Sequence, residues 1–310
     1  MKRLLFALLL VAGPASAEDE MRVILDWFVN PNHGPIIIAE ENGYFEDAGL
    51  AVEVIAPADP SLPAKLVAAG EADLAISYQQ QIHLDVHEGL PIIRVGTLIA
   101  TPLNCLLVLA DGPVQSLSDL KGRSIGFSVA GVDEAIIKVL LDQAGLTLDD
   151  VEMVNVNWSL APSLMSRQVD AVIGAARNFQ PNQMSIDGIE GRCFYLEEEG
   201  FPAYDELIYV AKSDAIDKDK ISRFLGATER ATQFIINNPD RAFEIFAQTS
   251  PELDDELNKR AWADTLARFA ARPAAVDMGR YAAYEKFMAD AGLVENVRPA
   301  SDFAIDVTAE

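Results

Sequence analysis

The chain has 310 residues, 50% of them hydrophobic, and a formal net charge of −24 at pH 7. An acidic surface of this kind repels nucleic acid and anionic lipid, so neither is expected as a partner. The length and apolar content suit one large domain or two lobes, each with its own core.

The N-terminus has the features of a signal peptide. Lys2 and Arg3 precede the apolar run "LLFALLLVAG", and "ASA" at positions 15–17 offers a small-residue cleavage site. The apolar run is too short for a transmembrane helix. We therefore expect residues 1–17 to be a signal peptide and the mature protein to be exported, without direct membrane insertion.

Short apolar runs alternate with helical patterns along the rest of the chain, which is typical of an α/β fold. The first set of predicted elements consists of strands over 21–28, 50–57, 72–78, 92–99 and 104–110, with helices over 35–45, 61–70 and 80–89. The second set consists of strands over 119–128, 151–158 and 169–175, with helices over 131–146 and 161–168. A strand over 205–214 follows, and the pattern from residue 215 onward is helical.

The second set of elements repeats the layout of the first. The segment "LPAKLVAAGEADLAISY" matches "LAPSLMSRQVDAVIGAA": a helix, a short link, an aspartate (Asp73 or Asp170) and a short strand. We therefore predict two similar α/β lobes. Lobe 1 is expected to consist of residues 18–110 and of 208–310 with its C-terminal helices, and lobe 2 of residues 111–207. The chain passes twice between the lobes, and these two crossings make a hinge, as in proteins that close around a ligand.

The two cysteines, Cys105 and Cys193, belong to a chain that is expected to be exported, where a disulfide is permitted. Two distant cysteines with apolar neighbours are not by themselves a disulfide framework. The segment "LNCLLVL" predicts a buried strand, so the simplest interpretation of Cys105 is a small core hydrophobe. The spacing leaves the pairing open.

Aromatic and polar residues gather where predicted elements meet. In "VILDWFVNPNHGPIIIAEENGYF", Trp27 and Phe28 end an apolar run, and amide and imidazole side chains follow; Tyr78 ends another strand. Open α/β sheets bind ligands at strand ends, so these residues mark a candidate ligand site, although Trp27 and Phe28 taken alone are also typical of core residues. Neighbouring strand residues point to opposite faces, so we expect only one of Trp27 and Phe28 to face the ligand.

Five stretches carry a resemblance to a known family: "LDWFVNPNHGPIIIAEENGYFEDAGLAVEV", "AGEADLAISYQQQI", "LKGRSIGFSVAG", "GAARNFQPNQM" and "EEEGFPAYDELIYVA". With them, nearly the whole mature chain resembles the substrate-binding proteins of ABC importers of the thiamin-pyrimidine group. The resemblance implies the bilobal type II periplasmic binding-protein fold, a periplasmic location, and a permease with a cytoplasmic ATPase as partner. It also implies a thiamin-related aminopyrimidine ligand, such as formylaminopyrimidine or hydroxymethylpyrimidine.

The resemblance and the chemistry of an aminopyrimidine together suggest the ligand-binding residues. A carboxylate matches the exocyclic amine and the protonated ring nitrogen bidentately, and we expect Glu197 or Glu198, beside the second crossing, in this role. Arg177 is expected to hold an acidic side chain in place or to contact a formyl oxygen. The full set of expected ligand-binding residues is Trp27, Asn30, Asn32, His33, Tyr78, Gln79, Ser128, Arg177, Asn178, Glu197, Glu198 and Tyr204.

Three alternatives remain open: a riboflavin binder, a binder of a sulfonate- or nitrate-type solute, and an enzyme similar to eukaryotic thiamin-pyrimidine (HMP-P) synthases. Asp133 and Glu134 occupy the helix turn where an anion would bind, which weighs against an anionic solute. The synthases use a lysine for pyridoxal phosphate and a cysteine-rich run for iron. This chain has no lysine between Lys2 and Lys65 and one cysteine in "GRCFYLEEEG". We therefore expect no catalytic residue and no cofactor.

Two histidines stand four residues apart on one predicted helix. The spacing of His83 and His87 would allow both to bind a metal ion from one helix face. No third ligand and no H-E-x-x-H order accompany them, so we interpret them as part of a solvated helix and expect no metal site. We expect the protein to be a monomer.

Overall fold

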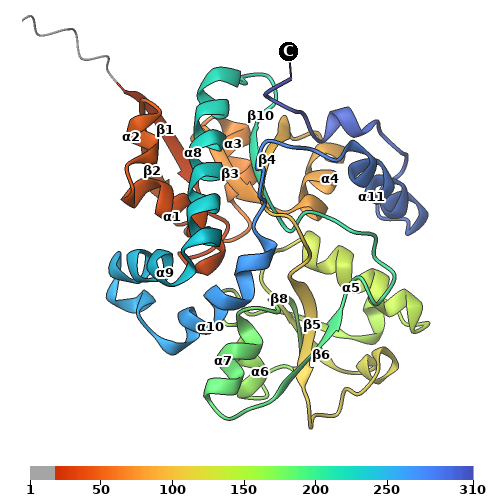
Figure 1. Cartoon of the computed structure of the whole chain (residues 1–310). Coiled ribbons are helices and arrows are strands. Elements are labelled where there is room, and N and C mark those ends of the chain that lie inside the picture. Colours follow the sequence, from red (N-terminus) through yellow and green to blue (C-terminus); the bar gives the residue numbers. More distant parts are fainter. Residues whose placement is uncertain (1–17, 310) are drawn as a thin grey trace, which may run out of the picture.

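The computed structural model describes residues 18–309, so the signal peptide expected over residues 1–17 lies outside the described residues. In this range the chain forms two mixed sheets with helices packed on them, one sheet in the upper and one in the lower half of Figure 1. No helix among residues 18–309 is long and apolar enough to cross a membrane.

The elements follow the predicted alternation of strand and helix, except that the helix Gln180–Ile186 and the strand Gly191–Tyr195 were not predicted. The strands are β1 (Asp19–Ile24), β2 (Leu50–Ile55), β3 (Leu74–Ser77), β4 (Ile92–Ile99), β5 (Asn104–Leu109), β6 (Ser124–Phe127), β7 (Glu152–Asn155), β8 (Ala171–Ala176), β9 (Gly191–Tyr195) and β10 (Leu207–Lys212). The helices are α1 (Gly34–Glu41), α2 (Tyr44–Asp47), α3 (Pro63–Ala69), α4 (Gln79–His87), α5 (Val132–Gln143), α6 (Leu160–Met165), α7 (Gln180–Ile186), α8 (Lys218–Asn237), α9 (Pro239–Gln248), α10 (Glu256–Thr265) and α11 (Met278–Asp290).

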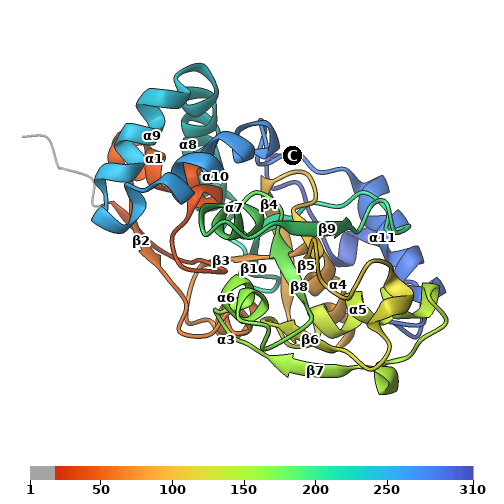
Figure 2. The same cartoon turned by 90° about the horizontal axis from the view of Figure 1, so that it is seen from below.

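The two sheets share one layout, as the internal repeat predicts. Their strand orders are β2-β1-β3-β10-β4 and β7-β6-β8-β5-β9, and Figure 2 shows the second sheet from below. In each sheet the first three strands are parallel and the fourth is antiparallel to the third. The repeat's aspartates have equivalent partners: Asp73 Oδ2 accepts from Arg22 N at 2.8 Å, and Asp170 Oδ2 accepts from Ser124 N at 3.1 Å. The predicted bilobal α/β fold is confirmed.

The boundary between the lobes differs from the expected one at residue 110. The strand β5 pairs with β8 and β9 in the second sheet, whereas we expected it in lobe 1. The first crossing therefore covers residues 100–103, and the second covers residues 196–206, after which β10 returns to the first sheet. Both β4 and β5 are buried apolar strands, so their residues do not reveal the sheet to which each belongs.

The C-terminal helices, expected in lobe 1, contribute to both lobes. Tyr281 of α11 lies in a core cluster of the first lobe, whereas Tyr284 and Met288 of the same helix lie in the core cluster around α5 of the second. The helix α10 lies at the junction, in contact with α7 and with the 3₁₀ turn Pro31–His33. The C-terminal segment therefore joins the lobes in addition to the two crossings.

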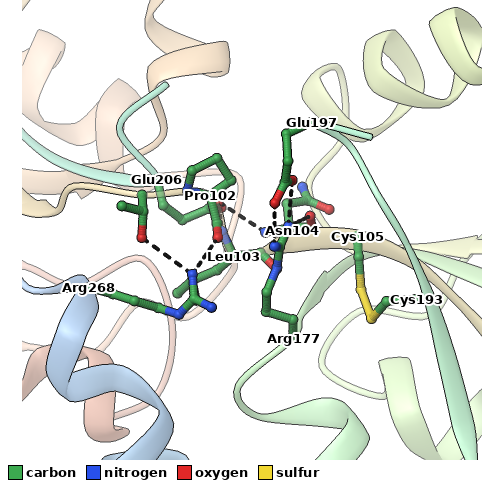
Figure 3. Close-up of polar contacts among 10 residues, drawn as sticks. Pro102, Leu103, Asn104, Cys105, Arg177, Cys193, Glu197, Glu206 and Arg268 are labelled. Atoms are coloured by element: carbon green, nitrogen blue, oxygen red, sulfur yellow. Dashed lines mark hydrogen bonds and ion pairs between the residues drawn. A yellow bond between two sulfur atoms is a disulfide. The ribbon is translucent and has the colours of Figure 1, made fainter. Parts of the chain in front are cut away.

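Cys105 and Cys193 form a disulfide, with 5.6 Å between their Cα atoms (Figure 3). Cys105 is fully buried, as expected of a core residue, and the disulfide decides the pairing that the spacing left open. The two cysteines lie on the neighbouring antiparallel strands β5 and β9. This neighbourhood depends on the strand order of the second sheet, which the 88-residue separation in sequence does not disclose.

Candidate functional site

A cavity lies between the two lobes. Its empty space is about 740 Å³ when the part that is open to solvent is included. Lobe 1 contributes residues that follow β1 and β3, and lobe 2 contributes the loop before α5 and part of β8. These are the strand ends at which open α/β sheets bind ligands. The expected ligand-binding residues that line the cavity are Trp27, Asn30, Asn32, Tyr78 and Ser128.

Aromatic side chains from both lobes surround this cavity. Trp27, Tyr78 and Phe179 line it. The rings of Trp27 and Trp158 meet edge to face with 4.5 Å between their centroids, so an aromatic contact joins lobe 1 to lobe 2. Phe28 is 43% exposed and does not line the cavity. As expected, only one residue of the Trp27–Phe28 pair faces the cavity.

A buried hydrogen-bond network fixes the floor of the cavity on the lobe 1 side. Asn30 N donates to His33 Nδ1 at 3.2 Å, so the ring proton is on Nε2, which donates to Asp26 Oδ1 at 2.9 Å. Tyr78 Oη donates to Asp26 Oδ2 at 2.8 Å. Burial, reinforced by the Asp26 charge, raises the pKa of Tyr78 well above its usual value. His33 was expected to contact the ligand, but it is fully buried and does not line the cavity. It positions Asp26 instead.

Two further carboxyl groups line the cavity, and both retain a proton more readily than usual. Burial raises the pKa of Asp133 to about 6, although its Oδ2 accepts hydrogen bonds from Ser128 N at 3.0 Å and Val129 N at 2.9 Å. Burial also raises the pKa of Glu206, whose Oε2 accepts from Leu103 N and Asn104 N. Among the described residues that line the cavity there is no lysine or arginine. The cavity therefore favours hydrogen-bond donors and cations over anions.

Gly174 of β8 makes room for one of these carboxyl groups. Its φ of +85° is one that side-chain-bearing residues rarely adopt, and a Cβ atom there would lie 3.0 Å from both carboxylate oxygens of Asp133. The Asp133 carboxylate itself occupies the backbone N–H groups before α5, where an anion would otherwise bind. The sequence-based argument against an anionic ligand thus has a structural basis.

Glu197 and Glu198, the expected acidic contacts of the ligand, do not line the cavity. Figure 3 shows Arg177 beside Glu197, with Nη1–Oε1 at 2.5 Å and Nη2–Oε2 at 2.7 Å. Arg177 also donates to the carbonyl oxygens of Leu103 and Asn104, at the first crossing. Glu198 is exposed, and none of Arg177, Glu197 and Glu198 lines the cavity. Arg177, which follows β8, therefore links Leu103 of the first crossing to Glu197 of the second. Holding an acidic side chain in place was one of the two roles expected of Arg177.

Three other expected residues also have structural partners instead of facing the cavity. Gln79 Oε1 accepts a hydrogen bond from Asp205 N at 2.8 Å. Tyr204 is fully buried in the core of lobe 2, edge to face with Tyr284. Asn178 Nδ2 donates to Asn32 Oδ1 at 2.7 Å, a contact between the lobes. The lobes are therefore closed on each other in this structure.

The histidine pair of α4 pairs with a carboxylate, with His83 buried and His87 partly exposed. His83 Nδ1 lies 2.8 Å from Glu285 Oε2, and His87 Nε2 lies 2.7 Å from Glu285 Oε1. His83 is fully buried, so the expected solvated helix face is wrong for this residue. Burial lowers the pKa of His83. The partner Glu285 belongs to α11, which is distant in sequence, so the sequence around the histidines does not reveal it.

The cavity contains polar residues that sequence reasoning missed: Asp26, Gln80, Asn104, Asp133, Gln180 and Glu206. Asp26 stands directly before the aromatic pair, which was an available signal. Asp133 was interpreted from the sequence only as an acid in the first turn of a helix. For Glu206 the signal was its place in the second crossing, beside the glutamates that were chosen instead.

The fold is that of the periplasmic binding proteins. An alkanesulfonate-binding protein of Xanthomonas axonopodis pv. citri has a TM-score of 0.73 to this chain at 14% identity, covering 94% of this chain and 99% of that one. The sequence profile of the family described as "NMT1/THI5 like" matches residues 30–242. The chain therefore belongs to the NMT1/THI5-like family.

Relatives in this family bear names of two kinds. A protein of Haemophilus influenzae that carries the name of a thiamine biosynthesis protein is 45% identical, over 96% of each chain. The formylaminopyrimidine-binding protein of Halalkalibacterium halodurans is 29% identical, over 82% of this chain and 78% of that one. The 4-amino-5-hydroxymethyl-2-methylpyrimidine phosphate synthase of Aspergillus parasiticus is 25% identical, also over 82% and 78%. The family thus includes both binding proteins and enzymes.

Proposed function

We propose that the protein is a solute-binding receptor of an ABC importer and that it binds a thiamin-related aminopyrimidine in the cavity between its lobes. The observation that carries this proposal is the combination of aromatic rings with the carboxyl groups of Asp26, Asp133 and Glu206 and without a basic side chain among the described lining residues. A flat, amine-bearing ring stacks on aromatic faces and donates hydrogen bonds to carboxyl oxygens. The formylaminopyrimidine-binding relative supports the same ligand class.

The same lining residues argue against the alternatives. A sulfonate or nitrate would place a negative charge beside three carboxyl groups, where nearby like charges are repelled. A synthase that holds pyridoxal phosphate through a Schiff base needs a lysine, and the described lining residues include neither lysine nor cysteine. The non-enzymatic role is therefore part of the proposal.

The location and partners follow from the same role. A receptor of this fold delivers its ligand to a permease and its ATPase, so the mature protein is proposed to act in the periplasm. The Cys105–Cys193 disulfide agrees with an oxidising compartment. Fractionation of cells that express the full chain tests the location.

Calorimetric titration tests the ligand. We expect 4-amino-5-hydroxymethyl-2-methylpyrimidine or its formylaminomethyl counterpart to bind with a micromolar or lower dissociation constant, that is, with about 8 kcal/mol or more. Riboflavin, taurine and nitrate serve as competitors. Binding of taurine or nitrate alone would refute the proposal, and a yellow purified protein would favour riboflavin. A pyrimidine product formed on incubation with pyridoxal phosphate and iron would favour the enzyme.

A further inference from the structure

Gln80 is a polar residue of the cavity whose hydrogen-bonding groups are unused. It lies in the first turn of α4, is 3% exposed and lines the cavity. Neither its Nε2 nor its Oε1 has a hydrogen-bond partner, and both are closed off from solvent. Among the described lining residues it is the one with such buried, unpaired side-chain atoms. A buried primary amide with no partner is unfavourable, which indicates that a partner arrives with the ligand.

We propose that Gln80 determines specificity by pairing with the amine-bearing edge of the ligand ring; this inference rests on the proposed function. A neutral aminopyrimidine presents a ring nitrogen, which accepts, beside an exocyclic amine, which donates. An ionised carboxylate only accepts, so Asp133 and Glu206 cannot serve that ring nitrogen while ionised. The amide of Gln80 supplies both groups: Nε2 donates to the ring nitrogen and Oε1 accepts from the amine. Glutamine makes the same reciprocal pair with adenine.

The division of roles follows from the number of hydrogen bonds that an amine can donate. One N–H of the exocyclic amine pairs with Gln80, and the second is left for a carboxyl oxygen. Asp133 Oδ2 and Glu206 Oε2 already accept backbone N–H groups, which leaves Oδ1 and Oε1 for the ligand. Gln80 therefore recognises the ring nitrogen and the amine of the neutral ligand, and the carboxyl groups accept the ligand's remaining hydrogen bond from the amine.

The test combines a variant with a ligand analogue. Gln80→Met keeps the length of the side chain but removes the amide, and the probes are 4-amino-5-hydroxymethyl-2-methylpyrimidine and its analogue with hydrogen in place of the amine. We expect Gln80→Met to weaken binding of the amine-bearing probe by about ten- to hundredfold, as for the loss of one bidentate pair. The analogue should bind wild type weakly and lose less in the variant than the amine-bearing probe does, because it lacks the amine's hydrogen bond to Gln80 Oε1 and keeps only that of the ring nitrogen to Nε2. Calorimetry measures all four affinities.

Controls separate this inference from the proposed function. Gln81→Met alters a neighbouring buried glutamine of α4 that does not line the cavity, and should bind the probe as wild type does. Thermal unfolding checks that each variant is folded, and Gln80→Leu replaces the methionine variant if that one is not. Equal binding by wild type and both Gln80 variants, or the same fold-loss for both probes, would overturn the role of Gln80 alone. No binding of the amine-bearing probe by wild type would refute the proposed function itself.

Discussion

Asn178 in lobe 2 donates a hydrogen bond from Nδ2 to Oδ1 of Asn32 in lobe 1, at 2.7 Å, and the same Nδ2 lies 2.6 Å from Thr265 Oγ1. Both asparagines were expected to contact the ligand; Asn32 lines the cavity, whereas Asn178 does not. All three residues are buried. A buried hydrogen bond that exists only when the lobes meet favours the closed form, and a ligand that prefers that form binds more tightly.

The first prediction concerns this contact. We expect Asn178→Ala to weaken ligand binding by about tenfold, because a lost buried hydrogen bond costs on the order of 1 kcal/mol or more. Calorimetry gives the affinity, and small-angle scattering gives the share of open molecules. Asn182→Ala is the matched control: Asn182 donates to Asp264 across the same junction, but at an exposed position, so its loss should change affinity little. Equal effects of the two variants would contradict the role of Asn178.

The second prediction separates the crossing glutamates from the ligand. Although burial alone would raise it, hydrogen bonds from Arg177 lower the pKa of Glu197. The pair therefore stabilises the fold at neutral pH, and this contribution is lost as the pH falls through the lowered pKa. We expect Glu197→Gln to cost about 1 kcal/mol or less, since the carboxylate is partly exposed, and to leave affinity nearly unchanged. Urea unfolding and calorimetry measure the two effects.

Glu198→Gln provides the comparison for Glu197. Its side chain is exposed and does not line the cavity, so neither stability nor affinity should change measurably. A clear loss of ligand binding in Glu198→Gln, with stability intact, would restore the original expectation that this glutamate contacts the ligand.

The third prediction concerns pH and the unliganded protein. Burial raises the pKa of Asp133 to about 6 from 3.8, so between these values the folded state binds more protons than the unfolded state. Stability therefore falls as the pH rises from about 4 to 6. Asp133→Asn should flatten this slope, on the order of 1–3 kcal/mol over the interval. Thermal unfolding at a series of pH values tests it, and an unchanged slope would contradict it.

Glu206 acts in the same direction, because burial also raises its pKa. Asp133→Asn should therefore remove only part of the slope. Asp170→Asn serves as a control: Asp170 accepts a hydrogen bond from Ser124 N outside the cavity, and the slope between pH 4 and 6 should persist in that variant.

The fourth prediction concerns the disulfide. Reduction, or the double substitution Cys105→Ala and Cys193→Ala, should lower the free energy of unfolding by about 2–4 kcal/mol, since the bond closes a long loop in the unfolded chain. Ligand affinity should change little, because neither cysteine lines the cavity. Unfolding by urea with and without reductant measures the first effect, and calorimetry the second. A strong loss of affinity would contradict this prediction and would show that the disulfide couples the hinge to the ligand site.

The elements of the fold and its repeat were predictable from the sequence because they depend on local patterns. Apolar runs predicted the strands other than β9, and the match between the segments around Asp73 and Asp170 predicted two equivalent sheets. The aromatic residues after β1 and β3 were likewise placed at the cavity, since strand ends follow directly from strand limits. Each of these inferences needs only neighbours in sequence.

Tertiary structure alone decided which side chains reach the cavity and which have another partner. Glu197 and Glu206 lie nine residues apart in one crossing, yet the first pairs with Arg177 and the second lines the cavity. Pairing between distant strands likewise decided the sheet of β5 and brought Cys105 beside Cys193. Local sequence sets the periodicity of an element. The partner of a buried polar group depends instead on which distant elements pack against it, and the whole fold decides this packing.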